Sequence, residues 1–140
     1  MSYALSTTMH TTFQDAVART RKALADQGFG VLTEIDMKAT LKAKLGEDME
    51  DYLILGACNP PLAHRAVSAD RQIGLLLPCN VAVRADPSAG SEAIIVDAMD
   101  PQVMVQVSDA PGLGEVADEA AARLSAVIEA LQAQTTQQEK

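Results

Sequence analysis

The spacing of hydrophobic residues along the chain follows two different periods, which predict helices and strands in one fold. Apolar residues recur every three or four positions in residues 12–27 and 113–133, and this spacing predicts two amphipathic helices. Alternating or continuous apolar runs bounded by turn residues predict strands over residues 2–10, 29–35, 52–58, 74–84 and 92–99. The mixture of both element types predicts an α+β fold.

Capping residues and prolines indicate where the shorter helices and the turns lie. Asp36 and Gly46 delimit one predicted helix. Its apolar positions share one face and are Met37, Leu41 and Leu45. Asn59, followed by two prolines, predicts the start of another helix over residues 62–69. Turn residues at 86–90 predict that the last two strands pair as an antiparallel hairpin.

The length of the chain indicates a single domain. A chain of 140 residues is near the commonest domain size, and we expect one α+β domain over residues 1–133 with a polar tail over residues 134–140. No apolar stretch approaches the roughly 18 to 20 residues that a membrane span needs. The first residues lack a cationic segment followed by an apolar one, so we predict no signal peptide and a cytoplasmic location.

The charge balance argues against polyanionic partners. The chain has 19 acidic and 11 basic residues, which gives a net charge of −8. Binding to nucleic acid or to an anionic membrane surface needs clustered Lys and Arg, so we expect neither partner. With two Phe, two Tyr and no Trp, the chain also has too few aromatic residues to build a platform on which bases stack.

The sequence motifs of several common enzyme classes are absent. The chain has no phosphate-binding loop ending in Gly-Lys-Ser/Thr, no Gly-x-Ser-x-Gly and no His-Glu-x-x-His. The Gly-x-Gly at residues 28–30 follows a predicted helix rather than a strand, which does not fit a dinucleotide-binding loop. We therefore favour a role without catalysis, and the residues indicate no particular cofactor.

Two cysteines carry the most distinctive chemistry, and each is followed by asparagine and lies close to proline. Cys58 is predicted to lie just before a helix N-terminus, where the helix dipole favours a thiolate. Cys79 follows Pro78, which cannot donate a hydrogen bond in a sheet and is expected at an edge, at a bulge or where a strand leaves the sheet. Because free cysteines are often buried and both lie among apolar residues, packing in the core is the stronger interpretation for each.

A functional thiol site is the alternative interpretation. If their strands are neighbours, Cys58 and Cys79 could form a reversible disulfide, or bind a soft metal ion together with His64. Three ligands are one fewer than structural zinc usually has, which weakens the metal interpretation. Asn59 has a simple role as a helix cap, whereas Asn80 in mid-strand needs a hydrogen-bond partner if it is buried.

Three segments of the chain resemble one protein family. They are Gly-Phe-Gly-Val-Leu-Thr-Glu-Ile-Asp-Met-Lys-Ala-Thr-Leu at residues 28–41, Ile-Leu-Gly-Ala-Cys-Asn-Pro-Pro-Leu-Ala-His at 54–64 and Ile-Gly-Leu-Leu-Leu-Pro-Cys-Asn-Val at 73–81. In this order the segments are similar to the family called domain of unknown function 302, over about residues 3–131. The resemblance implies a curved antiparallel sheet backed by helices, like the TATA-box-binding-protein class of folds, and often a homodimer. It does not imply DNA binding, because a shared fold carries no chemistry with it.

The resemblance implies no catalytic residues, but the family pattern concentrates on a few positions of this chain. The candidate binding or thiol site that it indicates is Cys58, Asn59, Pro60, His64, Pro78, Cys79 and Asn80. Our leading hypothesis is a homodimeric, non-catalytic module that binds a small ligand in a pocket beside the two cysteine segments. The competing hypothesis is a thiol-dependent redox or metal-handling protein that uses Cys58, Cys79 and His64.

Overall fold

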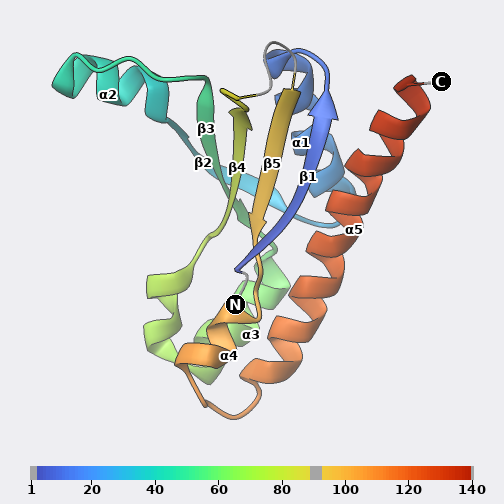
Figure 1. Cartoon of the computed structure of the whole chain (residues 1–140). Coiled ribbons are helices and arrows are strands. Elements are labelled where there is room, and N and C mark those ends of the chain that lie inside the picture. The colour runs from blue at the N-terminus through green and yellow to red at the C-terminus, as the bar shows by residue number, and fades with distance from the viewer. Residues whose placement is uncertain (1–2, 89–92, 140) are drawn as a thin grey trace.

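The structure, a computed structural model of the chain, describes residues 3–88 and 93–139 (Figure 1). Within these residues the chain forms strands, α-helices and one 3-10 helix. In chain order they are β1 (Ala4–His10), α1 (Phe13–Asp26), β2 (Gly30–Asp36), α2 (Met37–Leu45), β3 (Tyr52–Cys58), α3 (Pro60–Ala69), η1 (Arg71–Leu76), β4 (Cys79–Ala85), β5 (Ala93–Met99), α4 (Val103–Val107) and α5 (Leu113–Glu139).

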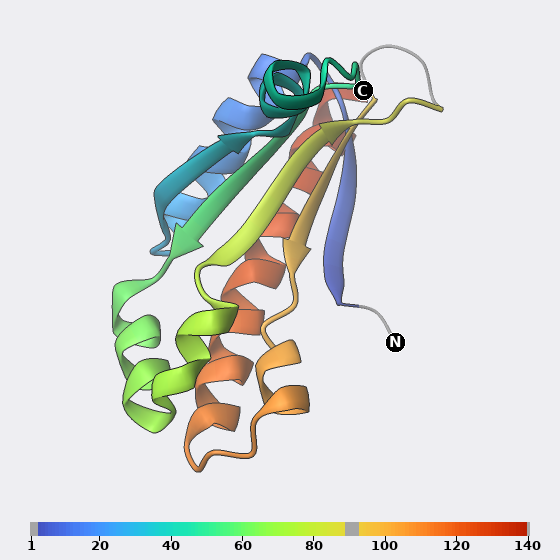
Figure 2. The same ribbon diagram turned by 90° about the vertical axis from the view of Figure 1, so that its left-hand side faces the viewer.

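The strands form one open, fully antiparallel sheet with the order β1-β5-β4-β3-β2. Helices α1 and α5 cover one face of this sheet and leave the opposite face open, where Ser6, Thr8 and Asn80 are exposed (Figures 1 and 2). The α+β class and the antiparallel pairing of β4 with β5 are thus confirmed. In the part of the chain that the structure describes, no helix is long and apolar enough to span a membrane.

Side-chain caps begin three helices at the positions that the sequence predicts. Thr12 Oγ1 accepts a hydrogen bond from the Asp15 backbone N–H at 3.1 Å, and Asp36 Oδ1 accepts one from Ala39 at 2.9 Å. Each bond satisfies one of the N–H groups that a helix leaves unpaired in its first turn. Asn59 caps α3 in the same way, so β3 passes directly into α3.

The predicted strand over residues 74–84 is wrong in its first part. Residues Arg71–Leu76 form η1 instead, and β4 begins only at Cys79. Pro78 lies between the two elements, after a cis peptide bond to Leu77. This proline therefore precedes the strand rather than interrupting it.

Local hydrogen bonds explain why the chain turns here rather than extends. The side chain of Asp70 accepts a hydrogen bond from the Gln72 N–H, and its carbonyl accepts one from Ile73, both at 3.0 Å. Such bonds from an Asp to the backbone just after it favour a turn over a strand. Ile73 is then buried at 2% exposure, so packing supports the same conformation.

Other differences from the predicted elements occur at element ends. Helix α5 continues to Glu139, past the predicted end at residue 133, because Gln and Glu make up most of this extension and are good helix formers. Ser2 and Glu92, at the ends of two predicted strands, and residues 89–90 of the predicted turn lie outside the described residues.

Helix α2 forms as predicted, but its apolar face is only partly covered: Met37 and Leu41 are half-buried. None of its residues is fully buried, and Leu45 is 68% exposed. The helix extends away from the rest of the fold (Figure 1). Asp36 caps its first turn, and Gly46 adopts the left-handed conformation, φ 71°, that ends the last. Lys38 of this helix also pairs with Asp51 at 3.3 Å.

The buried side chains form two clusters. The larger lies between the sheet and the helices α1 and α5, and includes Leu24, Leu55, Val81 and Leu124. The smaller joins α3, η1, α4 and α5 beyond the end of the sheet, and includes Leu62, Ile73, Met104 and Val116. Helix α5 runs through both (Figure 1). The end of β3 and the start of β4, where the two cysteines lie, are at the boundary between the clusters.

Candidate functional site

A cavity of about 270 Å³ lies where the two buried clusters meet. The larger cluster contributes Ala57 and Cys79 to its lining. The smaller contributes Ala66, Met104, Val116 and Ala120. The alanines of α3 and α5 leave this space because larger side chains at these facing positions would fill it. The cavity is therefore a product of how the two clusters meet, and its walls are predominantly apolar.

Cys58 and Asn59 reach the cavity from the end of β3. Cys58 is half-buried, and Asn59 is only 8% exposed. Asn59 Oδ1 accepts a hydrogen bond from the Leu62 N–H at 3.3 Å, and the Asn59 carbonyl accepts one from Ala63 at 2.9 Å. The two residues before Leu62 are prolines and have no N–H. The first turn of α3, as the structure describes it, therefore keeps no free N–H for a Cys58 thiolate, in contrast to what the sequence suggests.

Cys79 begins β4, the strand next to β3, and pairs with Ala57 across the two strands. Its side chain is 7% exposed. Burial, and to a lesser degree the nearby Cys58 sulfur, raise the pKa of the Cys79 thiol from 9.0 to about 11. At neutral pH Cys79 is therefore a neutral thiol that adds to the apolar wall of the cavity.

Gly56 lets Pro78 pack directly over strand β3. A Cβ at residue 56 would lie 2.8 Å from Pro78 Cγ and would overlap Thr33 Oγ1. Side chains do not approach one another this closely, so only glycine fits between the two. Pro78 can therefore form part of the cavity wall.

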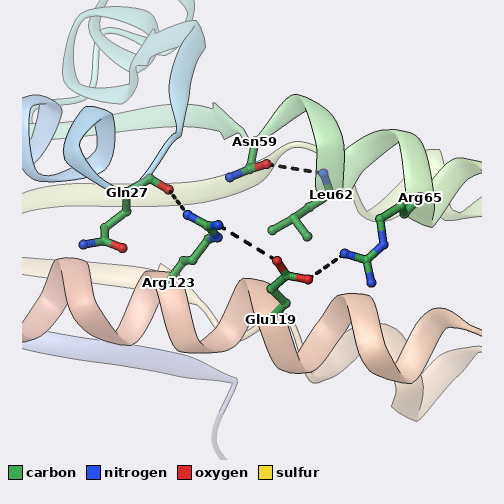
Figure 3. Close-up of polar contacts among 6 residues, drawn as sticks. All are labelled: Gln27, Asn59, Leu62, Arg65, Glu119 and Arg123. Carbon is green, nitrogen blue, oxygen red and sulfur yellow. Dashed lines mark hydrogen bonds and ion pairs between the residues drawn. The ribbon is translucent and has the colours of Figure 1, made fainter.

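A polar network beside the cavity ties three elements together (Figure 3). Arg123 of α5 donates a hydrogen bond from Nη1 to the carbonyl of Gln27 at 3.2 Å. Arg65 of α3 pairs with Glu119 of α5 at 2.6 Å, and Arg123 Nη2 lies 3.9 Å from the other oxygen of the same carboxylate. Glu119 thus lies between two arginines, and the network connects α3, α5 and the turn after α1.

The structure brings four of the seven predicted site residues together around this cavity. They are Cys58, Asn59, Pro78 and Cys79. Pro60 and His64 are exposed on α3 and do not line it. Asn80 is exposed on the open face of the sheet, where it lines a different hollow, because consecutive residues of a strand point to opposite faces.

The predicted combination of Cys58, Cys79 and His64 as metal ligands does not form. In residues 3–88 and 93–139, no three His, Cys, Asp or Glu side chains come together in a group that could hold a metal ion. His64 lies on the exposed side of α3, whereas Cys79 is buried. The candidate site therefore contains two thiols that could bind a soft ligand, and His64 does not join them.

The sequence did not predict the wall of the cavity that α5 forms, which we call the far wall, or the polar network. Val116 and Ala120 belong to the apolar stripe of the last helix, but the stripe does not distinguish an alanine that packs from one that borders a cavity. The pairing of Arg65 with Glu119 joins residues far apart in the chain, and no local pattern predicts it. The small residues at 63, 66 and 120 are the one signal in the sequence that could have indicated space.

Together these features define a class of protein: a small α+β domain with an open antiparallel sheet and an apolar cavity beyond its end. The family model for "Domain of unknown function DUF302" matches residues 5–131, so the chain belongs to this family. A solved structure described as "Crystal structure of uncharacterized conserved protein DUF302 from Bacillus stearothermophilus" is similar, with a TM-score of 0.82 and 25% sequence identity. The similarity covers 92% of this chain and 98% of that chain. No curated protein matches the sequence.

Proposed function

We propose that the protein is a non-catalytic module that binds a small, largely apolar molecule in the cavity between its two buried clusters. The single observation that carries this proposal is the cavity itself, about 270 Å³ in volume and lined by alkyl, aromatic and thiol groups with one amide. Ligand sites are typically concave and mostly apolar, with a few polar groups that orient the ligand, and occupy about 300–1,000 Å³. The volume here suits a ligand at the small end of that range.

The chemistry of the cavity wall supports binding rather than catalysis. Its titratable side chains, among the described residues, are Cys58 and Cys79. A general acid or base works best with a pKa near the working pH, and the pKa of Cys79 is about 11. The carboxylate and the two arginines of the polar network lie beside the cavity and are bonded to one another.

Titration calorimetry with octanol tests this proposal, because the alcohol is small, apolar and soluble enough to measure. Ala120→Leu places a larger side chain in the cavity, and we expect it to weaken octanol binding by at least about tenfold. Ala122→Leu adds the same atoms to an exposed position of the same helix and should leave binding unchanged. If octanol does not bind the wild type, or if both variants bind it equally, the cavity is not the site.

We also propose that the module is a homodimer in which a second copy covers the open face of the sheet. Ile35, Ile54 and Ala82 lie in register across β2, β3 and β4 on this face. Ile35 is 46% exposed, and a shallow hollow of about 780 Å³ extends over Ile54 and Ala82. Adjacent apolar side chains on an open sheet are typical of a contact surface. Helix α2 adds Leu45 to the exposed apolar residues near the same end of the fold.

Light scattering coupled to size-exclusion chromatography measures the mass of the protein in solution and so distinguishes a dimer from a monomer. We expect about twice the chain mass of 14.8 kDa for the wild type. Ile35→Glu places a charge in the apolar row and should give the monomer, whereas Thr8→Glu, at an exposed site on the polar side of the same face, should remain dimeric. A wild type that elutes with the monomer mass at micromolar concentration contradicts the homodimer.

The competing function, thiol-dependent redox or metal handling, has one observation in its favour. Cys58 and Cys79 line the same cavity from adjacent strands. The high pKa of Cys79 and the exposed position of His64 both work against it, because the thiolate is the form that attacks or ligates. In the reducing cytoplasm that we expect for this chain, both residues remain thiols. The reactivity of the two thiols distinguishes this function from ligand binding.

A further inference from the structure

We propose that the ligand of the cavity is an anionic amphiphile, a medium-chain carboxylate in which the apolar chain fills the cavity and the carboxylate meets Asn59 and Arg123. The inference rests on the proposed function, since it names the class of molecule that the same cavity binds. Two observations carry it: an amide nitrogen of Asn59 without a partner at the cavity wall, and an arginine pair that shares one carboxylate beside it.

The side-chain amide nitrogen of Asn59 is a hydrogen-bond donor that has no acceptor among the described residues. The oxygen of the same amide is occupied, because it caps α3 through Leu62. The nitrogen forms no hydrogen bond with any residue that the structure describes. Yet Asn59 is 92% buried and lines the cavity, while every fully enclosed side-chain nitrogen or oxygen in the described residues has a partner. The nitrogen is therefore not fully enclosed, and because Asn59 lines the cavity, a ligand oxygen at the cavity wall can accept a hydrogen bond from it.

Arg123 brings positive charge to the same place. A Cβ at Gly28 would lie 3.0 Å from Asn59 Nδ2 and 3.8 Å from Arg123 Nη1, so both nitrogens lie close to Gly28. Figure 3 shows the Asn59 nitrogen directed away from α3, towards the side of Gln27 and Arg123. An amide and a guanidinium that both lie near one residue suit a carboxylate, which has several lone pairs to share between them.

The local charge is not balanced without a ligand. Arg65 and Arg123 both pair with Glu119, and the described chain gives neither arginine another acidic partner. Arg123 contacts this carboxylate only at 3.9 Å, whereas Arg65 contacts it at 2.6 Å. The cluster thus carries one excess positive charge in a protein whose net charge is −8. One ligand carboxylate would balance it, and an ammonium group would not.

The rest of the cavity specifies the other half of the ligand. Leu62, Met104 and Val116 line it and offer no hydrogen bonds from their side chains. Its volume of about 270 Å³ is close to the lower limit of about 300 Å³ for small-molecule sites. That space suits a chain of several methylenes and is too small for a long-chain lipid or a nucleotide. Octanoate, which is ionised at neutral pH, is the natural probe.

Calorimetry of three ligands with the same chain length tests the head group. Octanoate, octanol and octylammonium share the apolar part, so differences among them report the polar end. We expect octanoate to bind the wild type at least about tenfold more tightly than octanol, the effect of one charge-assisted hydrogen bond, and octylammonium to bind most weakly. Without donors at the cavity, desolvation of the carboxylate would give the opposite order.

Two variants assign the preference to the named residues. Asn59→Asp keeps a good helix cap of nearly the same shape but replaces the donor with a negative charge. It should lose the preference for octanoate, measured as the ratio of the octanol and octanoate dissociation constants of the same variant. Arg123→Gln removes the charge from a partly exposed side chain and should reduce the preference as well. A thermal melt of each variant establishes that it folds, and either variant alone suffices for the comparison.

The outcomes separate this inference from the proposed function. Octanol binding without any advantage for octanoate overturns the anionic head group and leaves the apolar cavity as a ligand site. An octanoate advantage that persists in both Asn59→Asp and Arg123→Gln overturns the assignment to these residues. If none of the three ligands binds the wild type, the proposed function fails, and this inference fails with it.

Discussion

The side-chain nitrogen of Asn59 lies 3.0 Å from the point where a Cβ of Gly28 would stand, so the cap of α3 packs against the turn after α1. Gly28 has a φ of 85°, a conformation that favours glycine. The close approach thus depends both on the backbone conformation of Gly28 and on its missing side chain. It joins α3 to the turn that α5 also contacts, through the hydrogen bond from Arg123 to Gln27.

Gly28→Ala should lower the free energy of unfolding by more than the backbone conformation alone explains. The left-handed φ costs an alanine roughly 1 kcal/mol, and the contact with Asn59 adds to this. Gly46→Ala is the matched control, because Gly46 has a φ of 71° and nothing within 4 Å of its Cβ position. Urea denaturation of both variants measures the difference. Equal losses would indicate that Asn59 moves aside without cost.

Gly56→Ala should be among the more destabilising small substitutions in the chain. Its Cβ would overlap Thr33 Oγ1 and press on Pro78, and such overpacking costs roughly 1–3 kcal/mol. Gly74→Ala, with nothing within 4 Å of the new methyl group, should be nearly neutral. Adding Thr33→Ala to Gly56→Ala should restore part of the loss, and denaturation midpoints of the four proteins measure each step. No recovery in the double variant would show that Thr33 is not the obstacle.

The Cys79 thiol should react slowly with Ellman's reagent. Burial and the neighbouring Cys58 sulfur raise its pKa to about 11, so at pH 8 its thiolate fraction is about 100-fold smaller than that of a thiol with a pKa of 9.0. In Cys58→Ser burial still raises the pKa of the remaining thiol, which should react at least about tenfold more slowly in the folded protein than in urea. Rapid reaction of folded Cys58→Ser at pH 8 would instead support the thiol-dependent function.

The free energy of unfolding should depend on the ionisation of the Cys79 thiol at alkaline pH. Because folding raises the pKa of this thiol, its neutral form is favoured by the folded state. This contribution, roughly 2–3 kcal/mol, is complete below about pH 9 and is lost as the pH rises towards about 11. Cys79→Ala lacks this titration, so its stability deficit relative to the wild type should shrink from pH 8 to pH 11. A constant deficit over this range would show that Cys79 ionises without penalty.

Local hydrogen bonds made much of the fold predictable from the sequence. Thr12, Asp36 and Asn59 cap helices through atoms three residues away, and such contacts are encoded in neighbouring positions. Residues 74–76 were mistaken for part of a strand because their apolar run fits either element, and the bonds to Asp70 favour the 3-10 helix that begins at Arg71. The exposure of Leu45 on α2 was not predictable, since an apolar stripe does not reveal whether anything lies opposite it.

The part of the candidate site that the sequence predicted is the wall formed by the two cysteine segments. Cys58 and Cys79 come together because β3 and β4 are neighbours, as the sequence suggested they could be. Asn80 follows Cys79 on a strand, so the two side chains point to opposite faces and cannot share one cavity. The far wall on α5 and the ion pair of Arg65 with Glu119 depend on how distant helices pack. Such contacts leave no local pattern.

The central claim, that the cavity between the two clusters binds a small apolar molecule, is tested most directly by NMR. Addition of octanol to the ¹⁵N-labelled protein should shift the backbone amide signals of Ala57, Cys58, Met104 and Val116, which line the cavity. The same signals should not respond in Ala120→Leu. Shifts confined to Ile35, Ile54 and Ala82 on the open sheet face, or no saturable shifts at all, would contradict the claim.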